Sequence, residues 1–199
     1  MRPSVLAALA FVPLLLAGQQ PAPKPAPTLS GARQEILDNF RSVSNRALTL
    51  AKAVSEDQYA WRPMEGVRSM GEVFVHMAGS TLLFCSYAGL KPPPGPAQDL
   101  AAVYMRRGFE LPEIFAVEAK IKSKAKVLEI MEQAFRQPVE VLSNMKDSEL
   151  DKNVQFFNRT LTLRGVMILM DEHLGEHLGQ SIAYARVNHI VPPWSQKGQ

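Results

Sequence analysis

The 199-residue sequence has a single cysteine, no cluster of charges of one sign and no evident internal repeat. One cysteine excludes an intramolecular disulfide, so the folded state must be stabilised by packing or by a metal ion. Lys and Arg number 22 against 19 Asp and Glu, and their interspersion leaves a net charge of +3 without a basic stripe. We therefore expect no nucleic-acid partner. Hydrophobic residues at 46% and charged residues at 21% are typical of a folded domain and exclude a disordered chain.

The longest hydrophobic run lies at the N-terminus. Residues 1–18 contain Arg2, an apolar stretch interrupted by Pro13, and the small residues Ala17 and Gly18. This stretch is shorter than the roughly 20 residues of a membrane span. We therefore predict a secretory signal peptide and a periplasmic or extracellular protein without a stable membrane anchor. Residues 19–29 are proline-rich and predict a linker, followed by one helical domain over residues 30–195.

Apolar residues recur at helical spacing in four long segments. The first segment covers residues 31–54, and the second begins at the capping box Ser69-Met-Gly-Glu72 and ends near Tyr87. The third covers residues 112–145 as one helix or two, and Pro138 should kink or break it.

The fourth helical segment begins at the predicted cap Thr162 and ends near Val187, with Asn188 or His189 as a left-handed stop. Residues 91–112 predict a long loop with at most a helical turn over 100–106, and residues 146–161 predict a polar connection. With no convincing strand, the sequence predicts an all-α bundle.

Three histidines are candidate metal ligands. His173 and His177 are four residues apart and therefore project from one face of a helix, about 40° apart. This face also carries Met170 and Tyr184, which indicates that it points into the bundle. His76 lies on the buried stripe of the second helix. Three imidazoles and an open position suit Zn²⁺, Ni²⁺ or Fe²⁺, although hydrogen-bonded core histidines are an alternative interpretation.

Glu176 and Gln180 are candidate catalytic residues beside these histidines. Glu176 falls about 60° to one side of His173, where it can accept a proton, or it is a surface residue. Gln180 faces the site, where it can hydrogen-bond a ligand or hydrogen-bond other polar groups of the core. Tyr87, Tyr184 and the proline-rich loop at 91–96 would wall the pocket.

Three further residues are better explained by structural roles. Glu72 can reach a metal at His76, but the capping box with Ser69 already accounts for it. Cys85 should point away from His76, as a small buried hydrophobe. His189 follows the last helix, where we expect a cap or a surface residue.

The order and spacing of these motifs resemble the DinB-like superfamily. The resemblance rests on Ser69-Met-Gly-Glu72 before His76, on His173 to Gln180, and on Tyr184-Ala-Arg-Val-Asn188 leading to Val191-Pro-Pro-Trp194. It implies a four-helix bundle with a long crossover connection and a divalent metal ion held by His76, His173 and His177. Members of the family resemble transferases that use low-molecular-weight thiols, or metal-dependent hydrolases.

The sequence thus predicts an exported protein with a three-histidine divalent metal site, acting on a small molecule as a hydrolase or a thiol-dependent transferase. A non-catalytic metal-binding or stress-related module is the alternative. A helical bundle without metal is a third hypothesis, and a homodimer is compatible with all three.

Overall fold

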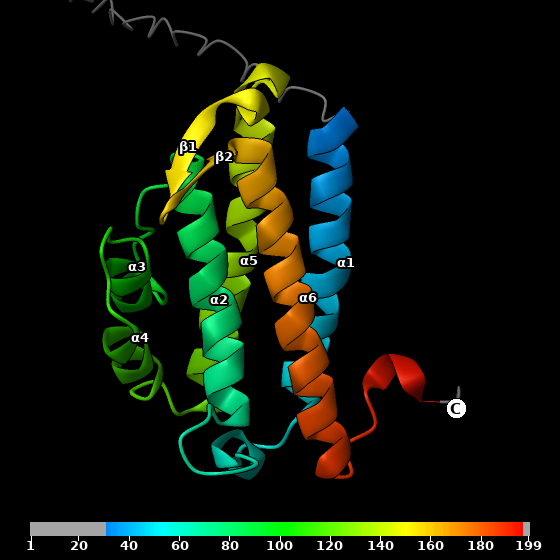
Figure 1. Ribbon diagram of the computed structural model, residues 1–199. Helices are drawn as coiled ribbons and strands as arrows, with labels where there is room; N and C mark the ends of the chain where they lie inside the picture. The colour runs from blue at the N-terminus through cyan, green and yellow to red at the C-terminus, as the bar shows by residue number, and fades with distance from the viewer. Residues whose placement is uncertain (1–30, 197–199) are drawn as a thin grey trace, which may run out of the picture.

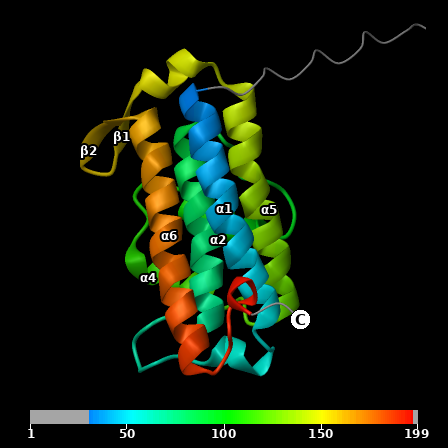
Figure 2. The same cartoon turned by 90° about the vertical axis from the view of Figure 1, so that its right-hand side faces the viewer.

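Four long helices form the body of the molecule (Figure 1). The computed structural model describes residues 31–196, so the predicted signal peptide and the whole of the predicted linker lie outside the described residues. The long helices are α1 (Gly31–Ala53), α2 (Met70–Tyr87), α5 (Lys124–Asn144) and α6 (Leu163–Val187). Both α1 and α2 pack against α5 and α6, as the two views in Figures 1 and 2 show. The predicted all-α four-helix bundle is confirmed.

Side-chain caps fix where the two histidine-bearing helices begin. The hydroxyl of Ser69 accepts a bond from the Glu72 amide at 3.2 Å, and the Glu72 carboxylate accepts one from the Ser69 amide at 2.7 Å. At α6, the Thr162 hydroxyl accepts the Gly165 amide at 3.1 Å. Both caps satisfy amides that a helix start leaves without partners, as predicted. At the other end of α6, His189 has a φ of +60° and provides the predicted left-handed stop.

The connection from α2 to α5 is the long crossover, and it contains two further helices. These are α3 (Gln98–Tyr104) and α4 (Leu111–Glu118), which lie together beside α2 (Figure 1). The helical turn allowed over 100–106 is the full helix α3, and α4 begins next to Pro112, where a helix was predicted. The predicted break at Pro138 is absent, since α5 continues through it. The chain breaks earlier, before α5, where the Ser123 hydroxyl caps the Lys126 amide.

A β-hairpin precedes α6, where the sequence predicted a connection without strands. Strands β1 (Asn153–Phe156) and β2 (Arg159–Thr162) pair antiparallel with Phe156 opposite Arg159. The strands have only four residues each and lack the long alternation that reveals a strand in sequence. Packing of the buried Phe156 against Phe84 and Tyr87 of α2 supplies the missing stabilisation.

Short 3-10 helices complete the fold at Asp57–Ala60, Asp147–Asp151 and Pro193–Ser195. The core lies between the four long helices and is filled by side chains such as Phe40, Phe74, Leu82, Ile130 and Met131. Among residues 31–196, no helix has the length and apolar character needed to cross a membrane.

Candidate metal centre

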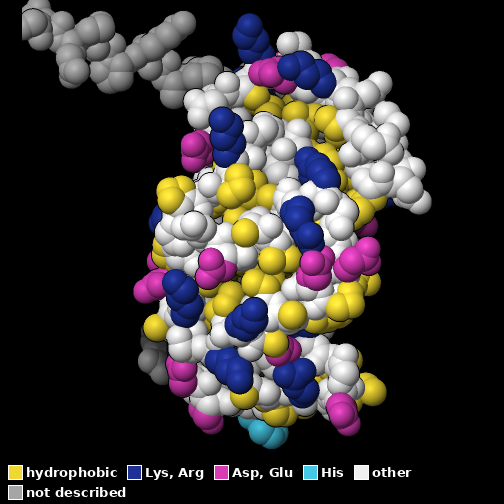
Figure 3. Space-filling model, turned by 90° about the vertical axis from the view of Figure 1, so that its left-hand side faces the viewer, with side chains coloured by type: hydrophobic (Ala, Val, Ile, Leu, Met, Phe, Trp, Pro, Cys, Tyr) yellow, Lys and Arg dark blue, Asp and Glu magenta, His cyan; other side chains and the backbone are white. Residues whose placement is uncertain are grey.

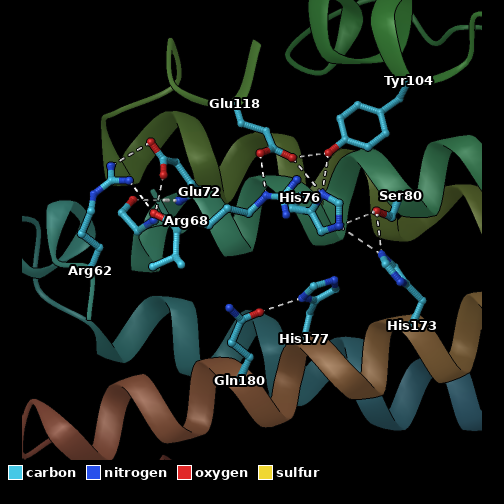
Figure 4. Close-up of polar contacts among 12 residues, drawn as sticks. Arg62, Arg68, Glu72, His76, Ser80, Tyr104, Glu118, His173, His177 and Gln180 are labelled. Carbon is cyan, nitrogen blue, oxygen red and sulfur yellow. Dashed lines mark hydrogen bonds and ion pairs between the residues drawn. The ribbon is translucent and has the colours of Figure 1, made fainter. Parts of the chain in front are cut away.

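The structure brings the three predicted histidines together where α2 and α6 pack (Figure 4). His76 projects from α2, and His173 and His177 project from α6. One ring nitrogen of each lies within 4.8 Å of the others. The Nε2 atoms of His76 and His173 are only 3.1 Å apart, and the Ser80 hydroxyl lies 3.0 Å from His173 Nε2.

His76 is oriented by residues from the crossover. Its Nδ1 lies 2.8 Å from Oε1 of Glu118, at the end of α4, and 2.7 Å from the hydroxyl of Tyr104, at the end of α3. The Tyr104 hydroxyl donates to the same carboxylate oxygen. Arg68 donates from Nε to the other oxygen of Glu118 at 2.7 Å. The crossover helices thus position a carboxylate behind the histidine (Figure 4).

The charges of this network settle which His76 nitrogen carries the proton. Burial alone would raise the pKa of Glu118, but hydrogen bonds from His76 and Arg68 lower it overall, so the group is a carboxylate. Burial and the charge of Glu118 raise the pKa of Tyr104, which stays a neutral donor. His76 therefore donates from Nδ1, and the lone pair of its Nε2 faces the other histidines.

His177 is oriented in a similar way within α6. Its Nδ1 lies 2.8 Å from Oε1 of Gln180, and the Gln180 amide nitrogen donates to the Tyr184 hydroxyl at 3.0 Å. That second bond directs the amide oxygen at the ring, so His177 donates from Nδ1. Gln180, predicted as a catalytic residue, thus positions a histidine.

The two histidines of α6 are neutral at neutral pH. Burial, helped by the neighbouring histidines, lowers the pKa of His173 to about 3. Burial also lowers the pKa of His177. Neutral imidazole is the form that binds a metal ion.

The donor set fits a divalent metal ion. The His76 lone pair points at His173 Nε2 at 3.1 Å, a contact that needs either a proton or a cation between the two nitrogens. Three imidazoles with a carboxylate behind one of them are typical of zinc, nickel and iron(II) sites. The alternative of hydrogen-bonded core histidines requires His173 to donate from Nε2 to His76.

A cavity of about 440 Å³ opens beside the cluster. His76, His173 and Ser80 line its inner end, and Glu176 lies on its wall. Most of the remaining lining is apolar and comes from α2, α3, α4, α6 and the hairpin.

The predicted pocket walls were wrong. Tyr184 instead contacts Gln180 and the Trp61 ring, and Tyr87 packs on Phe156. The loop at 91–96 borders a separate groove against α5. The hairpin, which the sequence did not predict, lines the cavity together with residues of α2, α3, α4 and α6.

The structural roles predicted for Glu72 and Cys85 are supported. Glu72 closes the capping box and also accepts a hydrogen bond from Arg62 at 3.1 Å. Cys85 is fully buried outside the histidine cluster, and burial raises the pKa of its thiol.

Glu118, Tyr104 and Arg68 were missed by sequence reasoning. A signal existed for two of them, because Glu118 follows Ile114 by four residues and Tyr104 follows Leu100 by four. A polar group on an apolar helical stripe needs a buried partner. Nothing in the sequence pattern singled out Arg68.

The sequence model of the DinB superfamily matches residues 15–181. The chain belongs to the DinB superfamily. A curated relative, the protein YjoA of Bacillus subtilis, is 25% identical over 167 residues, which cover 82% of this chain and 96% of the relative.

Two solved structures share the DinB fold. A DinB-like protein from Bacillus cereus superposes with a TM-score of 0.63 at 16% identity, covering 80% of this chain and 95% of that one. The crystal structure of the Bacillus subtilis DinB-like protein superposes with a TM-score of 0.58 at 20% identity. The match covers 82% of this chain and 99% of that one. At these identities the likeness establishes the DinB fold.

Proposed function

We propose that this DinB-superfamily protein is a metal-dependent hydrolase of a small molecule, with the ion held by His76, His173 and His177. The observation that carries the proposal is a cluster of three histidines, two of which, His76 and His173, line a cavity. Structural zinc sites are closed by four protein ligands, whereas catalytic sites keep three and leave a position open. Because a cavity opens beside the histidines, the arrangement supports a catalytic metal site over a structural one.

The bound ion would supply a lowered pKa for a water or thiol nucleophile. Residues of the chain position the metal ligands and accept the proton. Glu118 and Tyr104 hold the His76 ring, and Gln180 holds the His177 ring. Glu176 borders the cavity, where its carboxylate can accept a proton from the nucleophile.

Two observations favour water over a thiol as the nucleophile. The cavity lining has two carboxylates, Glu172 and Glu176, against one guanidinium, Arg159, and this excess of negative charge disfavours an anionic thiol cofactor but not a water. The predicted signal peptide directs the protein out of the reducing cytosol to which low-molecular-weight thiols belong. We therefore propose hydrolysis in preference to thiol transfer, and we propose that the enzyme is exported.

Metal content and turnover test the proposal together. The full chain is purified without chelating resin, reloaded with Zn²⁺, Ni²⁺ or Fe²⁺, and compared with the double variant His173→Ala, His177→Ala. We expect near-stoichiometric metal and a metal-dependent rise in melting temperature in the parent, and neither in the double variant. His189→Asn is the matched control, since His189 lies outside the cluster and should leave metal binding intact.

Turnover separates the remaining functions. The metal-loaded protein is assayed with chromogenic aryl esters for hydrolysis, and with bacillithiol and a chromogenic electrophile for thiol transfer. Ester hydrolysis that disappears in the double variant supports the proposal. Thiol transfer alone would reassign the reaction, and bound metal without either activity would favour the non-catalytic module. Absence of metal after reloading would refute the metal site.

A further inference from the structure

Aromatic rings line the cavity in an unbroken series that starts at the histidines. The His173 ring lies 5.8 Å from Phe84 between centroids, and Phe84 stacks on Phe156 at 5.6 Å with an interplanar angle of 13°. Phe156 meets Phe157 edge to face at 4.8 Å. All four rings belong to the cavity lining. The series leads from the metal centre to the tip of the hairpin.

The series returns to the histidines through the crossover. Phe157 meets Phe109 edge to face at 5.8 Å, and Phe109 lies 6.4 Å from Tyr104. Tyr104 lies 6.0 Å from His76, which in turn lies 5.2 Å from His173. These rings also belong to the lining. The ring contacts therefore form a closed series, and every ring in the series lines the cavity, where an aromatic occupant can contact it.

The backbone at the hairpin tip is strained in a way that places Phe157 in this series. Of the two loop residues, only Phe157 has a positive φ, at +51°. The first loop position of such a two-residue turn is normally glycine, because a bulky side chain disfavours this conformation. Phe157 is nevertheless held there with 56% of its surface exposed. A strained, exposed aromatic residue at a cavity wall points to a binding role rather than a folding role.

Charges at the cavity do not select an ionic ligand. The lining contains one arginine, Arg159, together with Glu172 and Glu176, so both signs are present. The interior wall is apolar, and transfer of a charged group into it would be unfavourable. Hydrophobic side chains also reach the surface between charged ones on the face that carries α3 and α4 (Figure 3).

We infer that the cavity binds uncharged compounds carrying a flat aromatic group, with Phe157 as a specificity-determining residue and the reacting group directed at the three histidines. This inference rests on the proposed function for the reacting end only. The aromatic series belongs to the protein chain itself, so binding of the aromatic group is expected without metal. The cavity volume falls in the range of small-molecule sites.

The first test uses N-phenylnaphthylamine, an uncharged aromatic fluorophore, titrated into metal-free protein. We expect saturable binding in the parent and about tenfold weaker binding in Phe157→Gly, because the edge-to-face contacts are lost. Trp194→Ala is the control, since Trp194 is an exposed aromatic residue outside the cavity. This variant should bind the fluorophore with the affinity of the parent.

The choice of glycine separates binding from folding. Glycine relieves the positive φ, so Phe157→Gly should melt at the same temperature as the parent or higher while binding the fluorophore more weakly. Equal affinity in the parent and Phe157→Gly would overturn the inference, as would the absence of saturable binding in the parent. A lowered melting temperature with unchanged affinity would assign Phe157 to folding alone.

A second measurement links the cavity to the metal centre. Benzohydroxamate and acetohydroxamate share a metal-binding group and differ in the aromatic ring. On zinc-loaded parent we expect benzohydroxamate to bind about tenfold more tightly, and we expect this preference to shrink in Phe157→Gly. If neither hydroxamate binds while the fluorophore results hold, the proposed metalloenzyme fails and the aromatic site stands. Equal binding of both hydroxamates to the parent would overturn the aromatic preference.

Discussion

Two buried carboxylates of this molecule have opposite surroundings. Glu118 has 1% of its surface exposed and accepts hydrogen bonds from His76, Arg68 and Tyr104, which lower its pKa. Asp171 on α6 has 7% exposed and accepts one bond, from Asn39 of α1 at 3.0 Å. Its Oδ1 has no hydrogen-bond partner among residues 31–196. Burial raises the pKa of Asp171 to about 6, although Asn39 opposes the shift.

The comparison shows that burial alone does not determine the role of an acidic side chain. Glu118 keeps its charge because an arginine and a histidine surround it, and this charge orients His76, a candidate metal ligand. Asp171 faces α1, has no cationic partner in its hydrogen bonds and resists ionisation. We therefore expect Glu118 to stabilise the native state at neutral pH and Asp171 to destabilise it.

Removal of the Glu118 carboxylate should have the largest effect on stability. Glu118→Ala leaves the Arg68 guanidinium and the His76 Nδ1–H without their acceptor, and we expect a loss of about 3–5 kcal/mol in the free energy of unfolding. Urea denaturation at neutral pH measures it. Glu132→Ala, which breaks an exposed ion pair with Lys52, is the control and should change stability by less than about 1 kcal/mol. Equal losses in both variants would contradict the role assigned to Glu118.

A neutral isostere at Glu118 isolates its effect on the metal. Glu118→Gln retains an acceptor for His76 but removes the charge, so zinc affinity should fall about 10–100-fold. Competition with a chromophoric chelator measures this affinity. Gln180→Glu should act in the opposite direction, because it places a carboxylate behind His177. Unchanged affinity in Glu118→Gln would show that the carboxylate does not tune the site.

Replacement of the unpartnered acid should stabilise the protein, with a defined pH dependence. A folded-state pKa raised from 3.8 to about 6 means that stability is lost as the pH rises through this window. Asp171→Asn should therefore gain about 3 kcal/mol at neutral pH and almost nothing below about pH 4. Urea denaturation at both pH values measures the difference. A gain that is equal at both values would exclude ionisation as its cause.

The smallest effect is expected at Glu72, which lies four residues before His76 on α2. Glu72→Gln keeps an acceptor for the Ser69 amide but loses the ion pair with Arg62, and stability should fall by less than about 1 kcal/mol. Zinc affinity should stay at the parent value. A drop in affinity comparable to that of His76→Ala would reveal Glu72 as a ligand.

The bundle could be predicted from sequence because its signals are local. Helical spacing from Ile36 to Val54, the capping box at Ser69 and the cap at Thr162 each depend on residues a few positions apart. The hairpin could not be predicted, because Phe156 becomes a strand residue only by packing on Phe84, far away in the chain.

The histidine cluster was predictable for the same reason, and its surroundings were not. His173 and His177 are four residues apart, which places them on one helical face. Glu118 reaches His76 only because the crossover returns α4 to α2, a contact between residues 42 positions apart. A local pattern can mark Glu118 as unusual but cannot name its partner.

The hairpin and α6, which carries His173 and His177, follow one another without a linker, since β2 ends at Thr162 and α6 begins at Leu163. Each residue added inside this junction would rotate the histidines by about 100° about the helix axis, relative to the hairpin. Such a rotation would destroy the site. Residues added at Phe157 and Asn158 leave the strand register and the helix start unchanged. The two-residue tip is therefore the place where the length of the hairpin can change without rotating the histidines of α6.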